Sequence, residues 1–195
     1  RAGVGVDNVD VEAATQAGIL VLNTPDANTI STAEHTVAMM LALHHRIVEA
    51  HAHVAGGGWN RAAYEGDQLA GRTLGIVGFG RIGRAVAQRA LGLEMKVIAY
   101  DPFVRGETTL NGAVALAQNL EQLLRESDCV TLHASLSDET RHLVGPAQIS
   151  LMKRGAKLIN CARGALVDEP ALAQALNNGQ LGGAAIDVYE NEPPK

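Results

Sequence analysis

The stretch that decides the fold reads Leu74-Gly75-Ile76-Val77-Gly78-Phe79-Gly80-Arg81-Ile82-Gly83. An apolar run ends in a Gly-x-Gly-x-x-Gly loop, and the loop opens a segment of helical periodicity over residues 82–92. Asp101 stands eighteen residues beyond Gly83, at the end of the next apolar run. A glycine loop between strand and helix, with an acid about 20 residues further on, is typical of a dinucleotide-binding βαβ unit.

Each glycine of the loop has a physical task in such a unit. We expect Gly78 to allow the tight turn, Gly80 to let the backbone approach a pyrophosphate, and Gly83 to let helix and strand pack closely. Arg81 and Ile82 open the helix, whose free N–H groups and partial positive charge favour phosphate. The alternative is a structural glycine turn without a ligand.

Asp101 indicates which dinucleotide binds. Its carboxylate would accept hydrogen bonds from the ribose hydroxyls and repel a 2′-phosphate, which favours NAD over NADP. Arg105 nearby would soften that preference.

The rest of the chain extends this unit into a sheet. Helical patterns alternate with five apolar runs that lack polar alternation, as expected of strands buried on both faces. The runs cover residues 74–78, 97–100, 129–132, 157–160 and 184–187, and the helical patterns cover residues 82–92, 120–126, 147–152 and 170–177. The prediction is an α/β fold, a Rossmann-type doubly wound parallel sheet.

The N-terminal segment is less regular. Asp10 is expected to cap a helix over residues 11–17, and the apolar run 19–22 predicts a strand. Ser31, with Glu34 three residues later, predicts the start of one long helix that continues to about residue 55. The apolar residues 39–41 on that helix indicate core or a subunit interface.

Composition excludes several classes of protein. The 195 residues are 47% hydrophobic and carry a formal charge of −5, so a disordered chain is excluded and nucleic acid is an improbable partner. The longest apolar run falls far short of the ~18 residues that span a bilayer, so no membrane partner is expected. Two cysteines do not make a disulfide framework, which favours a cytoplasmic protein.

Candidate chemical groups follow the last two apolar runs. Arg163, followed by a glycine, would hold a carboxylate in a bidentate pair, or it is a surface arginine. The acids of residues 187–192 would orient a histidine or a nicotinamide, or they form a solvated loop. No metal site is expected, because His44, His45, His51 and His53 offer no pair four residues apart. Cys161 has no evident activating base, so a nucleophilic role is disfavoured.

Taken together, the motifs resemble the nucleotide-binding region of the D-isomer-specific 2-hydroxyacid dehydrogenases over essentially the whole chain. The resemblance is carried by residues 1–10, 23–25, 69–83, 160–164 and 187–193. It implies NAD as the cofactor, a small 2-hydroxy or 2-oxo acid as the substrate, and a homodimer or higher homo-oligomer. It also implies that residues 1–23 are the C-terminal stub of a substrate-binding domain and that residues 24–195 are the NAD-binding domain.

The resemblance implies individual roles as well. Arg163 would bind the substrate carboxylate and polarise the keto oxygen, and Glu192 would hydrogen-bond the catalytic histidine and raise its pKa. The backbone of Val4 and Gly5 would face substrate and nicotinamide, and Arg1 would contact a substrate phosphate.

On the cofactor side, the resemblance implies that Asp187 bonds the nicotinamide carboxamide while Cys161 and Ala162 line that end of the dinucleotide. Ala134 is expected to contact the cofactor, next to the position that forms part of the adenine-pocket wall in the family. Ser135 stands where the family usually has proline, which predicts weaker adenine packing, and His133 is expected to be structural.

The family's catalytic histidine is expected beyond Glu192, past residue 195, since none of the seven histidines occupies a matching position. We therefore expect this chain to bind NAD and to turn over slowly or not at all. The favoured reaction interconverts 3-phosphoglycerate and 3-phosphohydroxypyruvate in serine biosynthesis. Glyoxylate or hydroxypyruvate reduction and a non-catalytic, NAD(H)-sensing, corepressor-like module are the alternatives.

Overall fold

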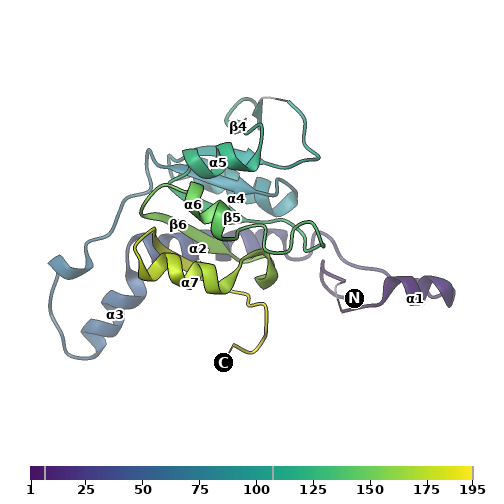
Figure 1. Ribbon diagram of the computed structural model, residues 1–195, viewed down its shortest axis with the longest axis horizontal. Helices are drawn as coiled ribbons and strands as arrows, with labels where there is room; N and C mark the ends of the chain where they lie inside the picture. Colours follow the sequence, from purple (N-terminus) through teal and green to yellow (C-terminus); the bar gives the residue numbers. More distant parts are fainter. Residues whose placement is uncertain (7, 107, 195) are drawn as a thin grey trace.

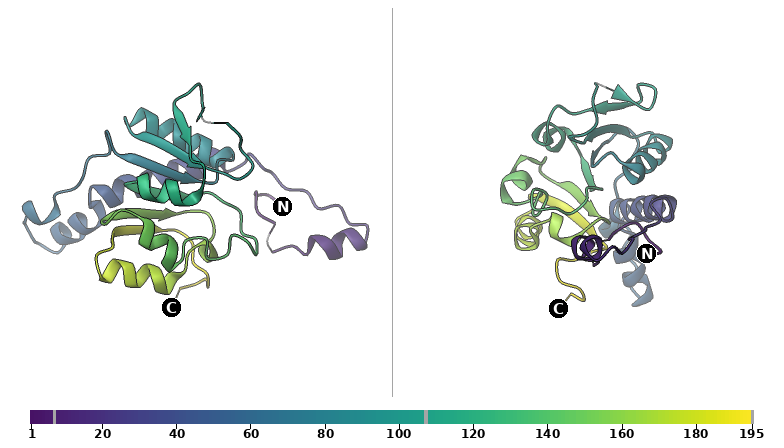
Figure 2. Two further views of the ribbon diagram at one scale, coloured as in Figure 1. Left: turned by 45° about the horizontal axis from the view of Figure 1, so that its top comes forward. Right: turned by 90° about the vertical axis from the view of Figure 1, so that its right-hand side faces the viewer.

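The computed structural model describes residues 1–6, 8–106 and 108–194. Its centre is one twisted sheet with helices on both faces, and an N-terminal arm extends from one side (Figures 1 and 2). The strands are β1 (Thr73–Val77), β2 (Lys96–Tyr100), β3 (Thr108–Thr109), β4 (Val114–Leu116), β5 (Cys129–Leu132), β6 (Ala156–Asn160) and β7 (Leu181–Ile186). The helices are α1 (Val11–Gln16), α2 (Thr29–His44), α3 (Ile47–Ala55), α4 (Arg81–Gly92), α5 (Leu120–Glu126), α6 (Pro146–Leu151) and α7 (Glu169–Asn177), with 3₁₀ turns η1 (Ala62–Tyr64) and η2 (Gly164–Leu166).

The strand order is β3-β4-β2-β1-β5-β6-β7. All neighbours pair in parallel except the edge pair β3–β4, which is antiparallel. The chain therefore runs outward from β1 in both directions, and the carboxyl ends of β1 and β5 lie side by side where the order reverses. This is the doubly wound arrangement that the sequence predicted, and its reversal point is where such sheets bind ligands.

Two apolar layers hold the helices against the sheet. On one face, Val86 and Ala90 of α4 and Met40 of α2 pack against the strands. On the other face, α5, α6 and α7 contribute Leu123, Ile149 and Leu172. Met40 is 1% exposed. Of the apolar residues 39–41, which were expected in the core or at a subunit interface, this one therefore lies in the core.

The five predicted strands and the four helices of the sheet region are all present, within a few residues of their expected bounds. Two short strands, β3 and β4, were missed: β3 contains no apolar residue, whereas β4 lies in the apolar run 113–117, which was a usable signal. Asp168 caps α7 through a 2.9 Å hydrogen bond from the backbone N–H of Ala171.

Three expectations for the N-terminal third were wrong. The long helix is broken between α2 and α3, because Arg46 adopts a left-handed conformation with φ of 52°. The helix α2 begins three residues earlier than predicted, after Asn28 rather than after Ser31, and Ser31 lies inside it, where its hydroxyl donates to the Asn28 carbonyl. Residues 19–22 form no strand, although the Asp10 cap of α1 is confirmed by a 2.8 Å bond from the Ala13 N–H.

Apolar side chains of residues 19–22, where a strand was expected, are exposed: Ile19 is 62%, Leu20 79% and Leu22 65% exposed. No residue of α1 is buried. The arm of residues 1–24 instead folds back on itself, since the Thr24 N–H donates to the Gly3 carbonyl and the Asn23 amide donates to the Val4 carbonyl. A strand needs a neighbouring strand, and among the described residues none lies beside 19–22.

Candidate active site

The glycine loop is the sharp turn between β1 and α4. Gly78 has φ of 91°, and a Cβ there would lie 2.6 Å from the backbone nitrogen of Ala134. A Cβ at Gly83 would lie 2.2 Å from the carbonyl oxygen of Gly78. Both glycines are therefore required by the fold itself, in the ways that the sequence indicated.

Gly80 is different. It precedes α4 in an extended conformation with φ of −76°, and a Cβ there would meet nothing within 4 Å. No packing within the described chain calls for a glycine at this position, so the open space in front of it fits the approach of a ligand to the backbone. The N–H groups of the first turn of α4 face the same region, where a phosphate is favoured.

Two charged side chains flank this loop. The Asp101 carboxylate accepts hydrogen bonds from the backbone N–H groups of Phe79, at 2.8 Å, and Phe103, at 2.9 Å. Each carboxylate oxygen has a second lone pair, so the group keeps capacity for two more donors. Arg81 is paired with Asp26, at 2.7 Å between Nε and Oδ1, which offsets part of its charge near the phosphate position.

The loop after β6 places the arginine. Asn160 is buried at the end of the strand; its amide donates to the Arg163 carbonyl at 2.9 Å, and its oxygen accepts from the Ala162 N–H at 3.1 Å. The Arg163 guanidinium donates to the Ala162 carbonyl at 2.7 Å. Asn160 thus fixes the turn that carries Arg163. This role was not predicted from the sequence, although a polar residue at the end of an apolar run could have indicated it.

The segment after β7 packs directly on that turn. A Cβ at Gly164 would lie 1.9 Å from the carbonyl carbon of Tyr189, so a glycine after Arg163 is what lets the two segments meet. Glu192 accepts a 3.0 Å bond from the Tyr189 N–H. Glu190 pairs with Arg141 at 2.7 Å and with His142 at 3.2 Å, which anchors the acidic segment.

A cavity of about 860 Å³ lies between these segments and the N-terminal arm. It is lined by the expected catalytic pair, Arg163 and Glu192, by Ala162, and by Arg1, Val4 and Gly5 of the arm. The structure therefore brings together, around one cavity, residues from the two ends of the chain to which the resemblance gave roles toward the substrate, the catalytic histidine or the nicotinamide. Arg1 also hydrogen-bonds the Asn8 side chain from the same arm.

The remaining cofactor candidates lie beside this cavity rather than in its lining. Asp187 follows β7, and its Oδ1 lies 3.2 Å from Nε2 of His35 on α2. Cys161 follows β6, is 8% exposed, and has its Sγ 3.5 Å from the Met39 sulfur. Burial raises the pKa of the Cys161 thiol, which agrees with the expectation that it is no nucleophile.

His133 and Ala134 form the wall behind Gly78. His133 lies 3.0 Å from the Thr131 hydroxyl, and burial lowers its pKa to about 4. An imidazole with this pKa is neutral at pH 7 and a very weak acid, so this histidine is poorly suited to protonate a carbonyl oxygen during its reduction by hydride. Ser135 is exposed at the start of the following loop.

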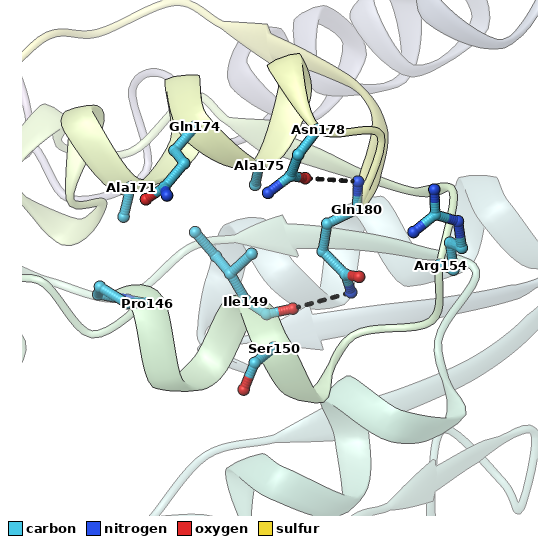
Figure 3. A pocket seen from close by; sticks show the side chains of 9 residues that line it. All are labelled: Pro146, Ile149, Ser150, Arg154, Ala171, Gln174, Ala175, Asn178 and Gln180. Atoms are coloured by element: carbon cyan, nitrogen blue, oxygen red, sulfur yellow. Dashed lines mark hydrogen bonds between the residues drawn. The ribbon is translucent and has the colours of Figure 1, made fainter.

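A second hollow, of about 500 Å³, lies between α6 and α7 (Figure 3). Gln180 crosses it and donates to the carbonyls of Ile149, at 3.3 Å, and Met152, at 2.9 Å. Arg154 and Gln180, which line it, precede β6 and β7, so this hollow opens at the amino ends of the strands. Ligands of open α/β sheets bind at the opposite edge, which favours the cavity at Arg163 as the active site.

Residues 37–195 match one protein family, the NAD binding domain of the D-isomer specific 2-hydroxyacid dehydrogenases, and the chain belongs to that family. It is 49% identical to D-3-phosphoglycerate dehydrogenase of Methanocaldococcus jannaschii over 195 residues, which are 100% of this chain and 37% of that protein. The chain thus spans little more than a third of the curated relative.

Solved structures of related dehydrogenases have the same fold. A glyoxylate reductase from Paecilomyes thermophila superposes with a TM-score of 0.91 at 37% identity, over 98% of this chain and 58% of that one. D-Lactate dehydrogenase from Aquifex aeolicus, in complex with NAD and lactic acid, superposes with a TM-score of 0.89 at 38% identity, over 97% and 57%. These likenesses confirm the predicted Rossmann-type fold, the NAD cofactor and the family. Within the described residues, no helix is long and apolar enough to cross a membrane.

Proposed function

We propose that this chain is the nucleotide-binding part of an enzyme that transfers a hydride between NAD(H) and a 2-hydroxy or 2-oxo acid, with 3-phosphoglycerate and 3-phosphohydroxypyruvate as the substrate pair. The observation that carries the proposal is the shared cavity of Arg163 and Glu192, at the same carboxyl edge of the parallel sheet as the glycine loop and Asp101. A domain that only senses the nucleotide needs the loop and the acid but has no use for an arginine and a carboxylate facing a separate cavity.

The chain's own residues divide the work. NAD, when bound, supplies or accepts the hydride. The first turn of α4, with Gly80, Arg81 and Ile82, would hold the pyrophosphate, and Asp101 would hold the adenosine ribose. Asp187 would accept a hydrogen bond from the nicotinamide carboxamide. Cys161 and Ala162 would lie beside the nicotinamide ring, and Ala134 would lie beside the adenine.

The substrate would lie in the 860 Å³ cavity. Arg163 would pair with its carboxylate and polarise the keto oxygen, which stabilises the charge that develops there during reduction. The Val4 and Gly5 backbone would contact the same acid, and Arg1 would contact a substrate phosphate. Glu192 would hydrogen-bond a proton-transferring histidine supplied from elsewhere in the protein.

The proposal extends to the organisation of the protein. The exposed arm fits the idea that residues 1–23 belong to a substrate-binding domain and residues 24–195 to the NAD-binding domain, since Leu20 and its apolar neighbours would be covered in a complete domain. No residue of α3 is buried, and Val48, Val54 and Trp59 are 71%, 54% and 77% exposed, which supports a homodimer formed through this region. Two free cysteines support a cytoplasmic location.

The second candidate substrate is glyoxylate or hydroxypyruvate, favoured by the likeness to the glyoxylate reductase. The test is NADH oxidation by the full-length protein with 3-phosphohydroxypyruvate, hydroxypyruvate and glyoxylate. We expect the highest kcat/KM with the phosphorylated acid and a selective loss of that preference in Arg1→Gln. Equal or better turnover of glyoxylate would favour the second candidate, and NADH binding without turnover of any 2-oxo acid would favour a sensor.

A further inference from the structure

Three side chains that commonly bind metals meet beside the cavity at the carboxyl edge of the sheet. They are His35 on α2, Cys161 directly after β6, and Asp187 directly after β7. Their ligand atoms all lie within 4.8 Å of one another. The cluster does not include His44, His45, His51 or His53, the histidines at which the sequence predicted no metal site.

The fold fixes this meeting point. Strands β6 and β7 are parallel neighbours whose last pair is Asn160 with Ile186, so Cys161 and Asp187 are the next residues on adjacent strands. The Asp187 N–H donates to the Asn160 carbonyl at 3.0 Å, which continues the ladder to the cluster. Helix α2 packs across both strands and supplies His35 from a third direction.

The donor set suits Zn²⁺. An imidazole nitrogen, a thiolate sulfur and a carboxylate oxygen are its three usual protein ligands, bound at roughly 2.0 to 2.3 Å in tetrahedral geometry. Ligand atoms at such a centre stand about 3.5 Å apart. His35 and Asp187 are already 3.2 Å apart, and both side chains are about half exposed, so they can rotate to close the distance to Cys161.

The neighbouring Met39 sulfur, 3.5 Å from the Cys161 sulfur, adds a soft donor next to the thiol. A thiolate with a thioether alone would favour monovalent copper, whereas the hard carboxylate and the imidazole favour zinc.

We propose that His35, Cys161 and Asp187 form a Zn²⁺ site with three protein ligands and an open fourth position. Zinc at this site occupies the Asp187 carboxylate. Because Asp187 is the proposed partner of the nicotinamide carboxamide, zinc and NAD(H) exclude each other there; this consequence rests on the proposed function, whereas metal binding does not.

The site itself is tested on the 195-residue chain without cofactor. Zn²⁺ is titrated by calorimetry, and Co²⁺ is used as a spectroscopic probe, because a cobalt–thiolate bond gives a charge-transfer absorption. We expect one Zn²⁺ per chain, a thiolate band with Co²⁺, and binding at least tenfold weaker in His35→Gln and Cys161→Ser. His51→Gln, an exposed histidine on α3, is the matched control and should bind zinc like the parent.

Thermal melts establish that each variant is folded. Zinc binding to Cys161→Ser with unchanged affinity, or Co²⁺ binding without the thiolate band, would overturn the site.

The competition is tested by measuring the Kd of NADH with and without saturating Zn²⁺. The parent chain should bind NADH at least fivefold more weakly when zinc is present, and Cys161→Ser should show a much smaller effect. An NADH affinity that zinc leaves unchanged would overturn the competition. A metal-free chain that binds no NADH would contradict the proposed function instead, and the cofactor-free zinc titration would still decide the metal site.

Discussion

The Asp101 carboxylate accepts a 2.8 Å hydrogen bond from the backbone N–H of Phe79, the residue between the first two glycines of the loop. The acid that directly follows β2 is thereby hydrogen-bonded to the loop that follows β1. Because both lie at the carboxyl edge of neighbouring strands, the carboxylate stands at a fixed distance from the start of α4. One bond thus links the group proposed for the ribose to the group proposed for the pyrophosphate.

Replacing Asp101 by Asn should weaken NADH binding about tenfold, since one charged acceptor of the ribose hydroxyls is lost. The single Asn oxygen can still accept from Phe79, which should preserve the glycine loop, whereas the bond from the Phe103 N–H is lost. NADPH, which the carboxylate repels, should lose much less affinity or gain some. Fluorescence titrations with both cofactors measure this, with Asp138→Asn, an exposed acid in the loop after β5, as the control. Equal weakening for both cofactors would argue against a ribose contact.

Alanine substitutions at Gly80 and Gly83 should have different effects, the first on NADH affinity and the second on stability. Gly80→Ala should leave the melting temperature within a few degrees and weaken NADH binding tenfold or more, because the new Cβ meets open space in the chain but obstructs a pyrophosphate. Gly83→Ala should destabilise the fold by roughly 2 kcal/mol or more, since its Cβ would lie 2.2 Å from the Gly78 oxygen. Thermal melts and NADH titrations on both variants separate the two tasks. Full NADH affinity in folded Gly80→Ala would place the cofactor elsewhere.

Asn160 is predicted to be the positioning residue for Arg163. Its removal in Asn160→Ala takes away two hydrogen bonds of the buried turn, which should cost about 2 kcal/mol of stability. In the full-length protein, the KM for the 2-oxo acid should rise while NADH affinity stays close to that of the parent. Asn178→Ala, at the opposite edge of the sheet, is the matched control. Loss of NADH affinity alone would contradict the assignment.

Two histidines with lowered pKa values predict how stability depends on pH. Burial lowers the pKa of His44 and of His133 from 6.5 to about 4 in the folded chain. Between pH 6.5 and 4 the unfolded chain therefore binds protons that the folded chain does not. Stability should fall as the pH drops through this window, by up to about 1.4 kcal/mol per pH unit for each histidine, and these groups add no pH dependence above it.

His44→Leu isolates one of the two contributions. The ring is 2% exposed, and neither nitrogen has a hydrogen-bond partner among the described residues, so an apolar side chain of similar size should raise stability at pH 5 by about 1 kcal/mol or more. The slope of stability against pH between 4 and 6.5 should decrease as well. Urea unfolding at several pH values measures both, and an unchanged slope would contradict the low pKa.

Much of the fold was predictable because its signals are local. The run before Gly78 and the glycine spacing predicted the central βαβ unit, and repeated buried runs predicted the parallel sheet. The break at Arg46 was not predictable, since neither glycine nor proline marks it. The expected strand at residues 19–22 is not formed, because an apolar run indicates burial but does not specify a partner strand, and the described residues of the arm include no strand beside it.

The candidate site was predictable in part for the same reason. Arg163 and Glu192 stand in recognisable motifs, and the order of the strands brings them to one cavity. His35 could not be placed by the sequence, because its contact with Asp187 depends on how α2 crosses β6 and β7. Asn160 acts through hydrogen bonds in a turn whose shape only the structure shows.

The central claim is that the loop 78–83 and Asp101 form an NAD site, and direct binding to the 195-residue chain tests it. NADH should bind saturably, with one site per chain, more tightly than NADPH, and with its affinity reduced in both Gly80→Ala and Asp101→Asn. The absence of saturable NADH binding to the folded chain, or binding that neither substitution weakens, would contradict the account.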